Sequence, residues 1–313
     1  MARAPAIRAS KHTQQTDASM AVSPNNEPMT VTLGADVLFQ YRRFSLYNSP
    51  YVSHDRGCAI DLYPGSETDT SDDEGVPSPV AGEVLDVRTV RAPPRPYAAE
   101  HDYLVLVDTG SHVARLLHVE PAVEPGDVVE VGDPLGDLVR AGFFAPWVPN
   151  HIHLGFRPRE ANHYRASGSV PLDVDVEIQP VEWDGTGTVL ETGETWARLD
   201  EPAHPAPGEV FVGLESDGSV LDGGFPHYDW GGLLGEGTDA EIAGTRVGTV
   251  SGRDVRWRDC TVRANGQAVT GIALFCAQDG FGIKLVGEGV PFTTGEEVTV
   301  EIEANERLSD RVR

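Results

Sequence analysis

The sequence predicts an all-β protein, in which an antiparallel, barrel- or sandwich-like domain is followed by a second β-rich domain. From VTLGADVLFQY at residue 31 onward, short stretches of alternating apolar and polar residues are separated by Gly, Pro and Asp. The chain contains 34 Gly and 23 Pro, which leaves little room for long helices. No segment shows the apolar spacing of an amphipathic helix.

Three regions are expected along the chain. Residues 1–30 are rich in Ala, Ser, Thr, Gln and Asn and predict a disordered tail. Residues 31–172 predict the first β domain, which includes a solvated acidic loop at 65–75. The apolar pattern lapses in REANHYRASGSVP (159–171), and residues 173–313 then predict a β-rich domain whose role the sequence does not indicate.

Charge is the strongest feature of the composition. There are 49 acidic and 24 basic residues, a formal net charge of -25, and Lys11 and Lys284 are the only lysines. With 40% hydrophobic residues, this composition predicts a folded protein adapted to a salt-rich cytoplasm, where salt screens the self-repulsion. A protein that stays folded without added salt, as followed by circular dichroism, would contradict this hypothesis. No basic patch is present, so nucleic acid is not an expected partner.

Cysteine usage and the N-terminal segment indicate where such a protein works. Cys58, Cys260 and Cys276 are few and odd in number, which argues against a disulfide framework. The first 28 residues lack the apolar core of a signal peptide, and no stretch is apolar for long enough to cross a membrane. We therefore expect a cytoplasmic protein with no membrane partner.

The segment HIHLGFRP (151–158) carries the clearest sign of a chemical site. On a strand, His151 and His153 share one face, whereas Ile152 and Leu154 face the core. Two imidazoles about 7 Å apart at their Cα atoms can converge on one metal ion.

Two further side chains fit the same site. In GCAIDLYPG (57–65), alternation places Ile60 and Leu62 in the core and Asp61 on the other face, where it offers a carboxylate that zinc accepts beside imidazole. In the segment 103–138, His118 alternates with the apolar residues Leu117 and Val119.

Five segments occur in an order that resembles the lysostaphin-type zinc metallopeptidases. They are AIDL, SPVAGEVLDV, LLHVEP, GDVVEVGDPLG and HIHLGFRP, and the match covers roughly residues 54–158, about a third of the chain. The resemblance implies a duplicated hybrid motif β-barrel, a zinc cofactor and a peptide substrate. It also implies that Asp61 and His153 bind the zinc, while His118 and His151 flank the attacking water and the substrate carbonyl.

The sequence departs from the family pattern at the first ligand. The family has a His four residues before the Asp, and here that position is Gly57. His54 and Cys58 are the candidate replacements, and His54 is favoured because alternation puts Cys58 on the wrong face. A fully extended chain would place His54 about 23 Å from Asp61, so ligation requires a bulge or turn near Gly57.

The loop before His151 also departs from the family, which has Gly, Ser and Thr there. This chain has large apolar side chains, which either wall the substrate groove or cap the end of the barrel: Phe143, Phe144, Pro146, Trp147 and Pro149.

Three functional classes follow from the sequence. The first is a zinc-dependent peptidase or related amide hydrolase acting on an intracellular peptide. The second is a catalytically degenerate binding module, which Gly57 favours. The third is metal-free phosphoryl transfer, with His118 and His153 as a pair. A biotinyl or lipoyl carrier is disfavoured, since neither Lys11 nor Lys284 lies in this region. The oligomeric state is left open.

Overall fold

The structure is a computed structural model that describes residues 30–65 and 75–305. Nearly all of the predicted tail, and the predicted acidic loop apart from its two ends, lie outside these residues. Strands make up 49% of the structure and helices 3%, which confirms the predicted all-β fold class.

The described part of the first domain contains two short helices and eleven strands. The helices are α1 (Ala35–Leu38) and the 3-10 helix η1 (Val52–Gly57). The strands are β1 (Val31–Gly34), β2 (Arg43–Ser45), β3 (Ile60–Tyr63), β4 (Gly82–Arg91), β5 (His101–Asp108), β6 (His112–Leu117), β7 (Val119–Pro121), β8 (Val128–Val129), β9 (Gly136–Leu138), β10 (Ile152–Pro158) and β11 (Leu172–Asp175).

The described part of the second domain consists of strands and connecting turns. These strands are β12 (Ile178–Val181), β13 (Thr186–Gly193), β14 (Trp196–Leu199), β15 (Phe211–Ser216), β16 (Ser219–Phe225), β17 (Trp230–Leu234), β18 (Asp239–Ile242), β19 (Thr245–Ser251), β20 (Asp254–Trp257), β21 (Cys260–Ala264), β22 (Gln267–Val269), β23 (Gly271–Leu274), β24 (Cys276–Ala277), β25 (Lys284–Val286) and β26 (Glu297–Ala304).

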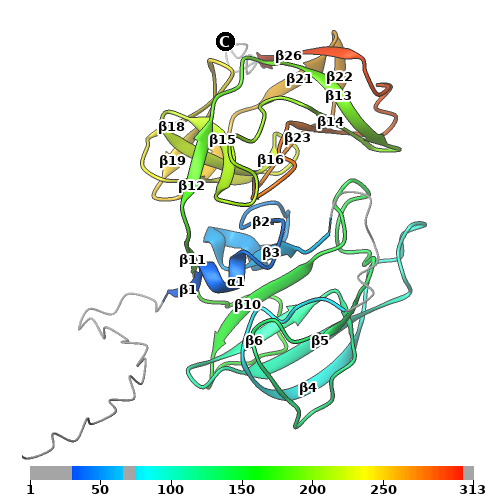
Figure 1. Cartoon of the computed structure of the whole chain (residues 1–313), viewed down its shortest axis with the longest axis vertical. Helices are drawn as coiled ribbons and strands as arrows, with labels where there is room; N and C mark the ends of the chain where they lie inside the picture. The colour runs from blue at the N-terminus through cyan, green and yellow to red at the C-terminus, as the bar shows by residue number, and fades with distance from the viewer. Residues whose placement is uncertain (1–29, 66–74, 306–313) are drawn as a thin grey trace, which may run out of the picture.

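A continuous run of hydrogen-bonded strands joins the two domains. Its order is β8–β4–β5–β6–β10–β3–β2–β24–β15–β12, and it passes from the first domain to the second where β2 pairs with β24. Figure 1 shows β2 and β3 lying between the two domains. The sheets are largely antiparallel, but β1–β11 and β12–β15 are parallel, and the described part forms no closed barrel.

Two local predictions were wrong. The strand expected over 31–41 ends at Gly34, and α1 follows because it buries Val37 and Leu38 in the core. The segment VPSPVAGEVLDV (76–87) predicts a strand, a turn and a second strand, but the first of these strands is reduced to one bridge between Pro77 and Pro134, since proline has no N–H to donate to a sheet.

A buried carboxylate ties the second domain to the first. Asp222 on β16 is fully buried and accepts hydrogen bonds from Ser45 Oγ at 2.5 Å, Leu46 N at 2.6 Å and Tyr47 N at 3.2 Å. Burial raises the pKa of Asp222 to about 6, although these hydrogen bonds oppose the shift. The turn after β2 is therefore held in place by the second domain.

This carboxylate should make the stability of the junction depend on pH. Relative to an Asp222→Asn variant, we expect the free energy of unfolding of the wild type to fall by about 3 kcal/mol between about pH 4 and about pH 7. The raised pKa means that the folded state holds the proton more tightly, so the contribution is full at low pH and is lost as the pH rises through about 6. Urea unfolding at constant salt measures it. A difference that does not change with pH would mean that the three donors keep Asp222 ionised in the folded protein.

Within residues 30–65 and 75–305, no helix is long and apolar enough to cross a membrane. The Gly-rich ends of GGFPHYDWGG (223–232) predict a turn in which Tyr228 and Trp230 are packed. Trp230 instead lies on β17 and is 49% exposed, because its indole stacks against Arg256 at the surface.

Candidate metal centre

Two adjacent strands place Asp61 and His153 side by side. Asp61 on β3 is the register partner of His153 on β10, and the two strands run antiparallel. Ile152 and Leu154, which flank His153, are fully buried in the core, as alternation predicts. His153 Nδ1 lies 3.0 Å from Asp61 Oδ1.

His54 reaches this pair because the chain coils back on itself before β3. η1 forms a short 3-10 turn, and it ends in left-handed conformations at Arg56 (φ 58°) and Gly57 (φ 62°). A Cβ at position 57 would also lie 2.4 Å from Nη2 of Arg253. Gly57 is thus a turn residue that a His could replace only with strain, and the turn brings His54 beside Asp61 and His153.

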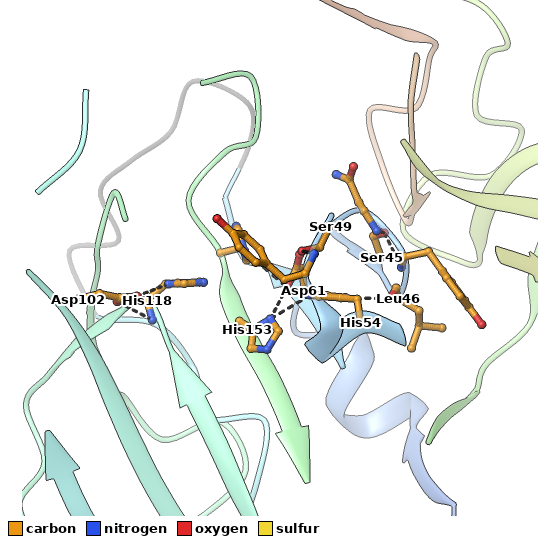
Figure 2. A network of polar contacts seen from close by, with 12 residues as sticks. Ser45, Leu46, Ser49, His54, Asp61, Asp102, His118 and His153 are labelled. Carbon is orange, nitrogen blue, oxygen red and sulfur yellow. Dashed lines mark hydrogen bonds and ion pairs between the residues drawn. The ribbon is translucent and has the colours of Figure 1, made fainter. Parts of the chain in front are cut away.

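The three candidate ligands form a compact triangle of donor atoms. His54 Nε2 lies 3.0 Å from His153 Nδ1 and 3.2 Å from Asp61 Oδ1. All three residues are buried, and they are the group of side chains in the described part whose donor atoms are near enough to share a metal ion. In Figure 2, His54 of η1 and His153 of β10 both lie against Asp61 of β3.

The triangle fits a zinc ion with one open position. Zinc bound at about 2.0–2.1 Å by tetrahedral ligands sets its donor atoms about 3.3 Å apart. The observed edges of 3.0–3.2 Å are close to that value. Two imidazoles and one carboxylate, with a fourth position left for water or substrate, form a donor set found in catalytic zinc sites.

A backbone carbonyl orients the His54 ring. His54 Nδ1 lies 2.8 Å from the carbonyl oxygen of Leu46. Because a carbonyl only accepts hydrogen bonds, Nδ1 carries the hydrogen and Nε2 faces the other two ligands. Leu46 is itself held by Asp222, so the second domain helps to position this ring.

The surrounding histidines stabilise the negative charge of Asp61. Burial raises the pKa of Asp61, but the charges and hydrogen bonds of His54, His151 and His153 outweigh it and hold this pKa well below its usual value. Burial lowers the pKa of His54, but Asp61 and the Leu46 carbonyl raise it above its usual value. Burial lowers the pKa of His153 to about 4, so this ring is neutral at pH 7 and has a lone pair for a metal.

His118 is held beside the cluster by Asp102. Its Nδ1 lies 2.7 Å from Asp102 Oδ2, and its backbone N–H donates to Asp102 Oδ1 at 3.0 Å. His118 adopts φ 71°, an uncommon conformation for a non-glycine residue, and Val139 N donates to its carbonyl. The carboxylate fixes the hydrogen on Nδ1, so Nε2, which has no partner among the described residues, is left as an acceptor. Figure 2 shows this pair to one side of the Asp61 cluster.

His151 completes the arrangement just before β10. Its Nδ1 lies 2.8 Å from the carbonyl of Pro149 and its Nε2 lies 3.5 Å from Asp61 Oδ1. The ring packs between Phe144 and His118, with centroid distances of 4.7 and 5.1 Å. Burial lowers the pKa of His151 to about 3, so the ring is neutral at pH 7 and Nε2 is an acceptor.

The cluster opens into a groove with apolar walls. Phe143 and Phe144 line it, whereas Trp147 from the same loop packs against Trp196 of the second domain. The loop therefore lines the groove, as one of the two alternatives predicted, and it also contacts the second domain, which neither alternative included. Tyr228 of the second domain also lines the groove, so the site is built from both domains.

All five side chains predicted for the site line this one groove. The cluster itself contains His54, Asp61 and His153, and His118 and His151 border it. Cys58, the alternative ligand, is not part of the cluster. That the cluster binds a metal ion stays a prediction.

Two functional contributions were missed from the sequence. Asp102 is one of 49 acidic residues, and only its pairing with His118 distinguishes it. Tyr228 lies in a Gly-rich segment that predicted no more than a turn, and its position depends on how the domains pack.

Comparison with known proteins assigns a family to the fold. The N-terminal domain of DUF8155, a domain of unknown function, matches residues 32–174, and the C-terminal domain of DUF8155 matches residues 179–303. No curated protein and no solved structure matches the chain. Both domains occur here in order and together span most of the sequence, so the chain belongs to the DUF8155 family.

Proposed function

We propose that this protein is a zinc-dependent peptidase or related amide hydrolase. The observation that carries the proposal is the triangle of His54 Nε2, Asp61 Oδ1 and His153 Nδ1, with edges of 3.0–3.2 Å, at a groove that also holds His118. The resemblance of residues 54–158 to the lysostaphin-type peptidases supports it. His54 supplies the third donor that the Gly57 position lacks.

The roles of the flanking residues follow from their hydrogen bonds. A zinc ion at the cluster would polarise an amide carbonyl and lower the pKa of a water molecule. His118 presents the lone pair of Nε2 to the groove, so it accepts a proton from water and then donates it to the leaving amine. Asp102 stabilises the imidazolium formed in between. His151, whose Nε2 is also an acceptor, orients the water through its second hydrogen.

The walls of the groove favour a peptide with apolar side chains. Tyr51, Phe143 and Tyr228 border the groove and offer ring faces to a bound chain. Such a lining differs from the Gly, Ser and Thr-rich loop of the lysostaphin-type family. We therefore expect cleavage next to an aromatic or branched apolar residue rather than within a Gly-rich peptide.

Metal analysis followed by incubation with a peptide library tests the proposal. We expect about one zinc ion per chain after purification without chelator, and cleavage products by mass spectrometry that disappear after chelation and return with zinc. Absence of zinc, together with absence of cleavage when zinc is added, would favour the catalytically degenerate binding module. Cleavage that survives chelation would contradict the role of zinc.

A further inference from the structure

A buried arginine without a counter-ion lies in the groove beside the candidate metal centre. Arg115 on β6 is 5% exposed and lines the same groove as His118 and His153. None of the ion pairs formed within residues 30–65 and 75–305 includes Arg115. A buried cation with no anionic partner is costly, so an unpaired guanidinium in a groove indicates a ligand that supplies the charge.

The hydrogen bonds of Arg115 leave most of its donors unused. Its Nε donates to the carbonyl of His163 at 2.5 Å, which orients the guanidinium, and neither Nη atom has a hydrogen-bond partner among the described residues. Arg157 on the neighbouring strand β10 provides a contrast. Both of its Nη atoms donate to backbone carbonyls of the same loop, those of Ser167 and Arg165. The Nη atoms of Arg157 thus hold the loop at 165–167, whereas both Nη atoms of Arg115 are available to bind a ligand.

The strand register places Arg115 two residues along the sheet from the candidate metal centre. Leu117 is the register partner of His153, and Arg115 is the partner of Gly155, two residues further along the same pair of strands. Two residues of a strand span about 7 Å, and an extended peptide advances by about 3.3 Å per residue. A group bound by Arg115 would therefore lie within about two residues of an amide bond at the metal centre.

The surroundings of Arg115 favour one planar anion over a diffuse negative charge. Apolar side chains, among them Val90, Leu104 and Leu117, line the same groove, and among the described residues Arg115 is the only Arg or Lys that does so. The chain as a whole carries a net charge of -25, which repels anions except where a cation is set locally. A guanidinium fork in an apolar wall matches a carboxylate, which accepts two parallel hydrogen bonds.

We propose that Arg115 binds a carboxylate of the substrate, so that the enzyme acts on short peptides or N-acyl amino acids whose free carboxylate lies within two residues of the cleaved bond. The cleavage in this inference rests on the proposed hydrolase function. The binding of a carboxylate by Arg115 does not depend on that function. The carboxylate is either the C-terminus of the peptide or an acidic side chain.

Binding of a matched acid and amide tests the inference without turnover. The probes are 3-phenylpropionate and 3-phenylpropanamide, titrated calorimetrically into the full-length protein after chelation, so that no metal competes for the carboxylate. We expect the acid to bind at least about tenfold more tightly than the amide. Arg115→Gln should abolish this preference, and Arg115→Lys, which keeps the charge but not the fork, should retain part of it.

Arg157→Lys is the control for a purely structural role. If the preference for the acid arises from an ordered loop, Arg157→Lys should lose it as well; if Arg115 binds the acid, Arg157→Lys should keep it. Thermal unfolding of each variant identifies any that fails to fold, and the milder Arg115→Lys then decides. Equal binding of acid and amide by the wild type, or equal losses in the Arg115 and Arg157 variants, would overturn the inference.

Cleavage assays separate this inference from the proposed function and identify the source of the carboxylate. With zinc restored, Ala-Ala-Phe should be cleaved faster than its C-terminal amide, and Ala-Ala-Glu amide tests a side-chain carboxylate. Equal cleavage of all three would support the hydrolase and contradict the role of Arg115. A preference for the acid in binding, with no cleavage of any peptide, would support Arg115 and contradict the hydrolase.

Discussion

Replacing His54 with alanine should remove most of the zinc from the purified protein, to the same extent as replacing His153. Each substitution leaves two ligands where a catalytic zinc site normally has three protein ligands. His54 Nε2 lies 3.0 Å from His153 Nδ1 and 3.2 Å from Asp61 Oδ1, so no other described side chain is placed to take over its position. Zinc content per chain, measured by elemental analysis, should fall from about one to near zero.

The free energy of unfolding should also reveal the loss of zinc from the two variants. If zinc binds only the folded state, an ion present at about 1,000 times its Kd stabilises the wild type by about 4 kcal/mol. This increment should vanish in both variants, which should then unfold alike with and without zinc. His112→Ala is the matched control, because His112 is a buried histidine on β6 that lies outside the cluster. Retention of about one zinc ion by His54→Ala would mean that His54 is not a ligand, and the binding-module alternative would gain support.

Replacing Asp102 with asparagine should lower the rate of hydrolysis by about 10²–10⁴-fold while zinc content is unchanged. Asp102 Oδ1 accepts the backbone N–H groups of Tyr103 and His118, and Oδ2 accepts Nδ1–H of His118. In asparagine, the single oxygen retains the backbone donors, so the amide NH₂ faces Nδ1. The His118 hydrogen then moves to Nε2, and the atom that faces the groove can no longer accept a proton.

The two residues should behave as one unit. His118→Ala should reduce the rate about as much as Asp102→Asn, and the double variant should lose little more, because each change disables the same base. Nitrogen-15 chemical shifts of the His118 ring report its tautomer without an activity assay and should change in Asp102→Asn. Fully additive losses, or an unchanged tautomer, would show that Asp102 acts independently of His118.

The side chains whose placement could be predicted are those that follow the alternation of residues along a strand. His151, His153 and Asp61 were assigned to the polar faces of two strands by alternation, and the register of β3 with β10 brings Asp61 opposite His153. His118 was predicted to alternate with Leu117 and Val119 along a strand, but β6 ends at Leu117 and β7 begins at Val119. It lies between the two strands with φ 71°, because the two hydrogen bonds that it donates to Asp102 hold it there.

The position of His54 shows why spacing alone is insufficient. An extended chain places it about 23 Å from Asp61, whereas the folded chain places its Nε2 3.2 Å from the carboxylate. The possibility of a turn followed from Gly57, which tolerates a positive φ, but its direction follows from contacts that are distant in sequence. The Leu46 carbonyl orients the ring, and Asp222 of the second domain holds Leu46.

Alternation of neighbouring residues along a strand was enough to predict the all-β class and to place Asp61, His151 and His153 on the polar faces of their strands. Tertiary structure alone decided that the second domain completes the site. Tyr228 reaches the groove and Asp222 anchors the turn before His54 because β2 pairs with β24 across the domain boundary. It also selected Asp102 and Arg115 from many charged residues, since burial and the presence or absence of a partner are properties of the packed chain and not of its local pattern.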